Sequence, residues 1–207
     1  MARRIAIVIG HNSKAPGAVR ASDGVSEYVW NGRLADEIQN LDPANVRVFR
    51  RLPAASYGAE IRKVYAEVDA WPADVSCELH FNSSVRGASG TETLYATNSG
   101  KAVALAVQAQ MVSALGLKDR GLLHRATGNG SQALLAGKAP AVLVEPYFGS
   151  NLADCARADE RFVLLARAIF SGLGGEPAPS SAPIPPVQAT LEERVSALED
   201  RLDAAGI

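Results

Sequence analysis

The sequence has few cysteines, almost no net charge and only short apolar runs, and each of these shortages argues against a class of protein. Cys77 and Cys155 are the only cysteines in 207 residues, and no metal-binding spacing relates them. They indicate two buried thiols in a protein made in a reducing compartment. The formal net charge is −1 at pH 7, so the chain lacks the overall basic surplus that favours nucleic acid. We therefore expect no nucleic-acid partner.

Membrane-directed segments are also missing from the sequence. No stretch approaches the roughly 20 apolar residues that span a bilayer, so we expect no insertion into a membrane. The apolar run that follows Arg3 and Arg4 covers only residues 5–9, whereas the apolar part of a signal peptide needs roughly 7–15 residues. We therefore expect the protein to be cytoplasmic when it is synthesised.

Composition divides the chain into a globular domain and an appendage. Hydrophobic residues make up 47% and charged residues 21% of the sequence, which is typical of a globular protein with one substantial core. We assign this domain to residues 1–175. The prolines at positions 177, 179, 183, 185 and 186 predict a semi-rigid, extended linker over residues 176–189.

Residues 190–207 are predicted to form a short coiled-coil helix. Thr190 and Glu193 make a capping box that marks its start. Apolar residues then follow at positions 191, 195, 198 and 202, which is the spacing of a heptad repeat. Barely two heptads are present, and isolated helices of this length are marginal in water. Two outcomes therefore stay open: a homo-oligomer held together by this helix, or a monomeric helix that frays.

Predicted strands and helices alternate along the globular domain. Short, continuous apolar runs predict buried strands, and apolar residues at helical spacing predict helices. The predicted strands are residues 4–10, 46–50, 75–81, 91–96 and 141–144. The predicted helices are residues 26–40, 57–70, 100–115 and 159–170. This alternation favours an α/β fold with a mostly parallel twisted sheet that carries helices on both faces.

Three possible metal ligands lie where such a sheet would bring them together. His80 ends one predicted strand, His11 follows another, and Glu27 lies just inside the first predicted helix. Open α/β sheets place their sites at the carboxyl ends of the strands. Two imidazoles and a carboxylate can form a catalytic zinc site that leaves one coordination position open. The alternative is that His80 only packs at the end of its strand.

A fourth residue, Glu145, follows the strand at 141–144 and is expected at the same edge of the sheet. A carboxylate beside a metal site is what a hydrolase needs, because it can take a proton from the attacking water and return it to the leaving group. Glu145 is therefore the candidate general base.

Several motifs, in this order along residues 4–172, resemble the type 3 class of zinc-dependent N-acetylmuramoyl-L-alanine amidases, which cut peptidoglycan. The motifs are Gly10-His11, Pro16-Gly17-Ala18, Glu27 with Asn31, an arginine at position 50 or 51, residues 77–83, Gly90 to Tyr95, Arg120-Gly121 and Leu143 to Asn151. The resemblance implies that His11, Glu27 and His80 bind Zn²⁺ and that Glu145 is the catalytic base. It also implies hydrolysis of the amide bond between N-acetylmuramic acid and L-alanine.

The sequence departs from the family pattern next to the predicted site. Asn12-Ser13 replaces the glycines that commonly follow the first histidine, and Ala15 stands where an aspartate often precedes Pro-Gly. Pro146-Tyr147 replaces a small residue and a glycine after the catalytic glutamate. No proposed ligand is lost, so these departures concern the shape of the loops and the choice of substrate.

Two other functions and several minor assignments stay open at this point. The chain could be a catalytically inactive module that binds cell wall, displayed on a coiled coil, or another zinc hydrolase, similar to a carboxypeptidase, on a similar sheet.

His124 is assigned to a polar loop, either solvated or beside the substrate. Arg50 and Arg51 are expected to pair with carboxylates rather than to touch substrate, and residues 128–130 to form a turn.

The expected place of synthesis leads to a role for the enzyme. A peptidoglycan amidase acts outside the cell membrane, whereas this chain is expected to be cytoplasmic when it is made. A phage-type lysin meets both conditions, because a separate permeabilising factor releases it onto the cell wall.

Overall fold

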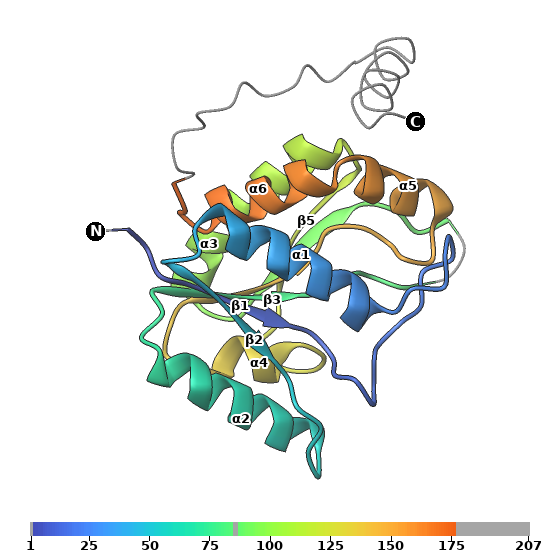
Figure 1. The fold of residues 1–207 in the computed structure, drawn as a ribbon. Coiled ribbons are helices and arrows are strands. Elements are labelled where there is room, and N and C mark those ends of the chain that lie inside the picture. The colour runs from blue at the N-terminus through green and yellow to red at the C-terminus, as the bar shows by residue number, and fades with distance from the viewer. Residues whose placement is uncertain (1, 85–86, 177–207) are drawn as a thin grey trace, which may run out of the picture.

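The computed structural model describes residues 2–84 and 87–176 of the chain (Figure 1). Apart from Glu176, the predicted linker at 176–189 lies outside the described residues. The predicted coiled-coil helix and possible oligomer contact at 190–207 lie wholly outside them.

Strands and helices alternate along the described residues. The strands are β1 (Ile5–Ile9), β2 (Val46–Arg50), β3 (Val75–Leu79), β4 (Thr91–Tyr95), β5 (Asp119–His124) and β6 (Ala141–Glu145). The helices are α1 (Glu27–Leu41), α2 (Tyr57–Ala70), α3 (Asn98–Leu115), α4 (Ser131–Ala136), α5 (Leu152–Glu160) and α6 (Phe162–Gly172). None of the helices in these two ranges is long and apolar enough to cross a membrane.

The strands form one mixed sheet in the order β2-β1-β3-β6-β4-β5. Strands β2, β1, β3 and β6 run parallel, and β4 pairs antiparallel with β6 and parallel with β5. The predicted mostly parallel sheet is confirmed. The reversal at β4 was not predicted from the sequence.

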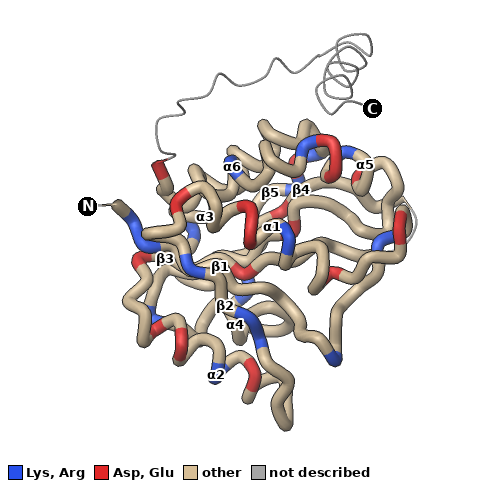
Figure 2. Tube along the Cα trace, viewed as in Figure 1, with Lys and Arg blue, Asp and Glu red and all other residues tan. Residues whose placement is uncertain are grey.

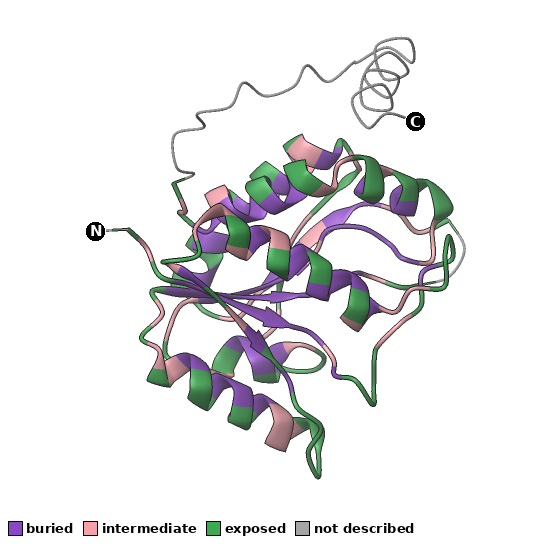
Figure 3. Ribbon diagram, in the orientation of Figure 1, coloured by how far each residue is buried: buried purple, intermediate pink, exposed green. Residues whose placement is uncertain are grey.

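Helices cover both faces of the sheet, as predicted (Figure 1). Because successive side chains of a strand point to opposite faces, Ile5, Ile7 and Ile9 of β1 join the core under α1, α3 and α6. Ala6 and Val8 of the same strand join a second core with α2. Strand β1 is fully buried between these layers (Figure 3).

The solvent-facing sides of the helices carry charges of both signs. On α2, for example, Arg62, Lys63 and Glu67 are exposed, while Ile61, Val64 and Val68 face the core. Figure 2 shows basic and acidic residues interspersed along this helix. This pattern is that of an ordinary amphipathic helix on the surface of a globular domain.

Three elements were missed by the sequence analysis. His124 was assigned to a polar loop, but residues 119–124 form the edge strand β5, whose residues are only partly buried or exposed. The six-residue helix α4 and the polar helix α5 also gave no clear periodic signal. The last predicted helix, at 159–170, is in fact α6, which begins at Phe162 after α5 has ended.

The register of the parallel strands brings three chain segments to one edge of the sheet. Ile9 of β1 pairs with Leu79 of β3, which pairs with Val144 of β6. The pairing continues one residue further, because Gly10 N donates to Leu79 O at 3.0 Å and His80 N donates to Val144 O at 3.1 Å. The residues that follow these strands therefore lie side by side.

Helices α3 and α6 approach each other closely at a glycine, which gives a test of the packing. A Cβ atom added to Gly172 would lie 2.5 Å from the backbone Cα of Val107. We expect Gly172→Ala to lower the free energy of unfolding by about 1–3 kcal/mol, because the two backbones must move apart. Urea denaturation followed by circular dichroism measures this change.

Gly32 provides the matched control inside α1. Its added Cβ would meet only the end of the Arg50 side chain, at 3.3 Å. Gly32→Ala should therefore leave the free energy of unfolding unchanged or raise it by up to about 1 kcal/mol. Equal effects of the two substitutions would contradict the tight α3–α6 contact.

Candidate metal centre

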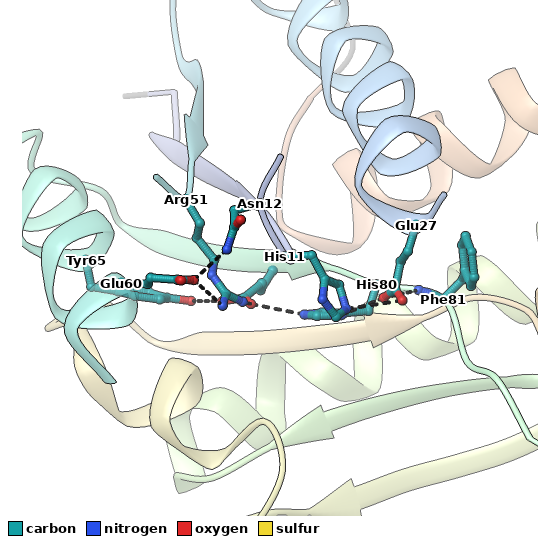
Figure 4. A network of polar contacts seen from close by, with 9 residues as sticks. His11, Asn12, Glu27, Arg51, Glu60, Tyr65, His80 and Phe81 are labelled. Carbon is teal, nitrogen blue, oxygen red and sulfur yellow. Dashed lines mark hydrogen bonds and ion pairs between the residues drawn. The ribbon is translucent and has the colours of Figure 1, made fainter. Parts of the chain in front are cut away.

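The structure brings the three predicted ligands together at the carboxyl edge of the sheet (Figure 4). His11 Nε2 lies 3.2 Å from Glu27 Oε2, and His80 Nδ1 lies 2.7 Å from Glu27 Oε1. One possible ligand atom from each residue falls within 4.8 Å of the other two. Two imidazoles and one carboxylate so close together have the donor chemistry of a catalytic zinc site.

Glu27 is held in place by backbone groups on both sides of its carboxylate. Its Oε2 atom accepts a hydrogen bond from Ala18 N at 3.2 Å, and its Oε1 atom accepts one from Phe81 N at 3.2 Å. In return, Glu27 N donates to Ala18 O and Tyr28 N donates to Pro16 O. The first N–H groups of a helix have no partner within the helix, so the segment around Gly17 caps α1 while it orients Glu27.

Two glycines leave the space that the ligands occupy. Gly17 has a φ of +80°, and an added Cβ would lie 2.7 Å from Glu27 Oε2 and 2.8 Å from His11 Nε2. A Cβ on Gly10 would collide with the ring of His80. The motifs Gly10-His11 and Pro16-Gly17-Ala18 therefore have a packing reason: any larger residue would push into the centre.

His11 itself has a left-handed backbone, with a φ of 66°. No other non-glycine residue in the described ranges has a positive φ. Such a conformation costs roughly 1–3 kcal/mol outside glycine and persists where the surroundings enforce it. Here it turns the chain sharply as it leaves β1, and the two histidine rings meet edge to face with centroids 5.0 Å apart.

The charges at the centre shift two pKa values in opposite directions. Burial alone would raise the pKa of Glu27, but hydrogen bonds from His11 and His80 outweigh burial and lower it to about 2. Burial alone would lower the pKa of His80, but its bonds to Glu27 and Glu78 raise it to about 10. The carboxylates thus favour positive charge between them. In the metal-free protein a proton on His80 supplies this charge, and a bound metal cation could take the place of the proton.

Glu145 stands beside the centre at the end of β6. Its Oε2 atom is buried and has no hydrogen-bond partner among the described residues. Burial raises the pKa of Glu145 to about 8, with His80 opposing the rise and Glu27 and Glu92 adding to it. A group with a pKa near neutrality can both take up and release a proton at working pH.

The centre opens into a cavity of about 710 Å³, which lies within the usual size range of ligand sites. His11, His80 and Glu145 line one part of it. Other parts of the wall come from β4, β5, β6 and the turn before α4, with Leu94, Leu123, Leu143, Arg125 and residues 128–130, and from Arg51, Tyr57 and Asn82. The cavity is therefore partly apolar, with the proposed catalytic groups at its wall.

The lesser sequence assignments have mixed outcomes. Arg50 and Arg51 pair with carboxylates, as expected: Arg50 with Asp36, and Arg51 with both Glu60 and Glu78. Residues 128–130 form a turn, with positive φ at Gly128 and Gly130, and this turn borders the cavity. His124 is exposed at the end of β5 and not in a loop, with Nε2 3.2 Å from Ala96 O.

Two charged residues of the site were not assigned a role from the sequence. Glu92 of β4 lies opposite Glu145, where its carboxylate accepts hydrogen bonds from Asn82 at 2.8 Å and Arg120 at 2.6 Å. Glu78 lies two residues before His80 inside the buried strand β3. A charged residue in an otherwise buried strand was the available signal for Glu78.

Comparison with known proteins identifies relatives with this fold. The protein YqiI of Bacillus subtilis (strain 168) is 31% identical over 181 residues, which cover 83% of this chain and 83% of that protein.

Two solved structures are also similar. The catalytic domain of CwlV, an N-acetylmuramoyl-L-alanine amidase from Bacillus (Paenibacillus) polymyxa var. colistinus, is 27% identical with a TM-score of 0.69, covering 82% of this chain and 96% of that one. The catalytic domain of the CD27L endolysin targeting Clostridia difficile is 25% identical with a TM-score of 0.70, covering 83% and 96%.

The match to a protein family agrees with these similarities. The model of the family described as N-acetylmuramoyl-L-alanine amidase matches residues 5–174, which include all six strands of the sheet and the residues around the centre. The chain belongs to the N-acetylmuramoyl-L-alanine amidase family.

Proposed function

We propose that this peptidoglycan amidase depends on zinc, which His11, Glu27 and His80 hold, and that Glu145 is its general base. The bond cut would be the amide between N-acetylmuramic acid and L-alanine. The observation that carries the proposal is the convergence of three donor atoms within 4.8 Å, beside a buried carboxylate on the wall of a cavity. The donor set of two imidazoles and one carboxylate fits zinc and leaves a position open.

The residues of the chain account for the proton transfers that hydrolysis requires. Bound zinc would supply Lewis-acid chemistry, polarising a carbonyl and making water more acidic. Glu145 takes a proton from water as the water oxygen attacks the carbonyl carbon of the amide. When the carbon–nitrogen bond breaks, Glu145 gives this proton to the departing amine of L-alanine. The reaction ends with a free carboxylate, a free amine and Glu145 ready for another cycle.

The cavity supports placement of the substrate next to these groups. Leu94, Leu123 and Leu143 give it apolar surface, and Arg125 adds a positive charge to its wall. A muramyl peptide combines apolar and carboxylate-bearing parts, so both kinds of surface have a counterpart in the substrate.

The two alternative functions differ from this proposal in measurable ways. A catalytically inactive cell-wall-binding module does not require three metal ligands and a general base. This chain has residues suited to all four roles, namely His11, Glu27, His80 and Glu145. A carboxypeptidase-like hydrolase would release amino acids from the stem peptide. Mass analysis of digested sacculi tells these products from those of an amidase, which separate whole stem peptides from the glycan.

We extend the proposal to a phage-type lysin, released onto the cell wall by a separate permeabilising factor. Similarity to the catalytic domain of an endolysin supports this extension. A bacterial amidase is about equally similar, so similarity does not distinguish a phage-type lysin from a bacterial enzyme. A lysis experiment in living cells does.

The proposed ligands can be tested by metal content. We expect about one zinc ion per chain in the purified protein and none retained in His80→Ala, because loss of one of three protein ligands should abolish tight binding. Elemental mass spectrometry after dialysis measures this. His124→Ala is the matched control, since His124 is exposed away from the centre, and it should keep its zinc. Stoichiometric zinc in His80→Ala would refute the assignment.

The proposed base can be tested by activity with the metal retained. Glu145→Gln should keep zinc and the fold but lose roughly 10²–10⁴-fold in the rate of sacculus digestion, the usual contribution of a general acid–base group. Glu160→Gln, an exposed change on α5, should digest sacculi at the normal rate. If Glu145→Gln instead lost its zinc, Glu145 would be a ligand.

The lysin role can be tested in living cells. If the protein is such a lysin, bacteria that express it should stay intact and should lyse when chloroform permeabilises the membrane. Turbidity of the culture follows this, with cells expressing Glu145→Gln as the control for chloroform alone. Lysis without chloroform would overturn this role and leave the amidase assignment standing.

A further inference from the structure

Glu78 is a buried carboxylate in the centre of the sheet, and the proposed reaction assigns it no role. It lies on β3 between Val8 of β1 and Leu143 of β6, and only 1% of its surface is exposed. A charge buried this deeply destabilises a fold unless partners surround it. The identity of those partners indicates what Glu78 does.

The two oxygens of Glu78 have different partners. Its Oε1 atom lies 3.0 Å from His80 Nε2 and 3.3 Å from Arg51 Nη1. Its Oε2 atom accepts a hydrogen bond from the Tyr65 hydroxyl at 3.1 Å. One oxygen therefore faces the metal centre, and the other is anchored in the core by α2.

The ring of His80 is held between two carboxylates. Its Nδ1 atom points to Glu27, on the side of the other ligands, while its Nε2 atom points to Glu78. A nitrogen that binds a metal carries no hydrogen, so the hydrogen of the neutral ring then resides on the other nitrogen. Glu78 accepts a hydrogen bond from Nε2–H in that arrangement, and Nδ1 is left free for the metal.

The same network reaches the chain beside the other histidine. Arg51, which contacts Glu78, also pairs with Glu60 at 3.0 Å. Glu60 Oε2 accepts a hydrogen bond from the side chain of Asn12 at 2.9 Å. Asn12 directly follows His11, and its Oδ1 atom accepts hydrogen bonds from the backbone of residues 14 and 15, both at 2.9 Å. The network thus connects the surroundings of both histidines.

We propose that Glu78 is a positioning residue that fixes the orientation of the His80 ring, so that Nδ1 and not Nε2 binds the metal. This inference rests on the proposed zinc site. Carboxylates that hold a ligating histidine typically strengthen metal binding roughly 10–100-fold. Arg51 offsets the negative charge of Glu78 and connects it through Glu60 to the loop after His11.

A purely structural role for Glu78 makes a different prediction. If Glu78 served only to pair with Arg51 and Tyr65, its replacement would lower the thermal stability of the domain and leave zinc affinity unchanged. Tyr65→Phe is a matched control, because it removes the hydrogen bond to Oε2 and keeps the contacts of Oε1 with His80 and Arg51.

The test measures zinc affinity by competition with a chromogenic chelator, and thermal unfolding of the metal-free proteins by circular dichroism. Glu78→Gln should bind zinc roughly 10–100-fold more weakly than the wild type, whereas Tyr65→Phe should lower the melting temperature and bind zinc normally. Normal affinity in Glu78→Gln, or an equal loss of affinity in both variants, would overturn the proposal.

A measurement on the unaltered protein covers the case in which Glu78→Gln does not fold. Long-range ¹H–¹⁵N spectra of the zinc-loaded wild type report which ring nitrogen carries the hydrogen, and the chain has only three histidines to assign. We expect His80 to bind zinc through Nδ1 and to keep a slowly exchanging hydrogen on Nε2. Zinc bound through Nε2 would overturn the role of Glu78 alone, whereas a wild type without zinc would overturn the proposed site as well.

Discussion

The arrangement of the whole site depends on the carboxylate of Glu27. It sits at the first residue of α1, where the helix N-terminus favours negative charge, and it contacts both histidines. Backbone N–H groups of Ala18 and Phe81 hold its two oxygens. A single side chain therefore ties together the loop after β1, the start of α1 and the end of β3. Because those three segments come from separate parts of the sequence, the centre exists only when the sheet and its first helix are assembled.

The mixed sheet explains why both ends of strands contribute to one site. The parallel strands β1, β3 and β6 present the residues at their carboxyl ends, as expected for an open α/β sheet. Strand β4 runs in the opposite direction, so its beginning lies at this edge and Glu92 comes to lie opposite Glu145. Asn82 and Arg120 hold the carboxylate of Glu92. The reversal thus adds a second, fully hydrogen-bonded carboxylate near the proposed base and contributes to the raised pKa of Glu145.

The parts of the fold that the sequence predicts are those buried on both sides. Strand β1 and the first four residues of β6 are continuous apolar runs because helices cover both faces, and β3 is equally buried although it contains Ser76 and Glu78. The four proposed site residues could be located from the ends of these strands and from α1. Strand β5 lies half exposed at the sheet edge, and α4 spans only six residues, so neither shows a clear period. The direction of β4 depends on its pairing with β6 and is not visible in its composition. The proposed role of Glu78 also depends on the partners that make its burial possible, Tyr65 and Arg51, which lie 13 and 27 positions away and which no local pattern contains.

The cavity is built from two sets of segments that are separate in the sequence. The proposed metal ligands come from residues 11–80, while much of the cavity wall comes from residues 123–132, around the turn between β5 and α4. Within residues 2–84 and 87–176, the hydrogen bonds that hold Glu27 and Glu78 come from other segments than this turn. The sequence of the turn can therefore change while the contacts that hold Glu27 and Glu78 stay the same.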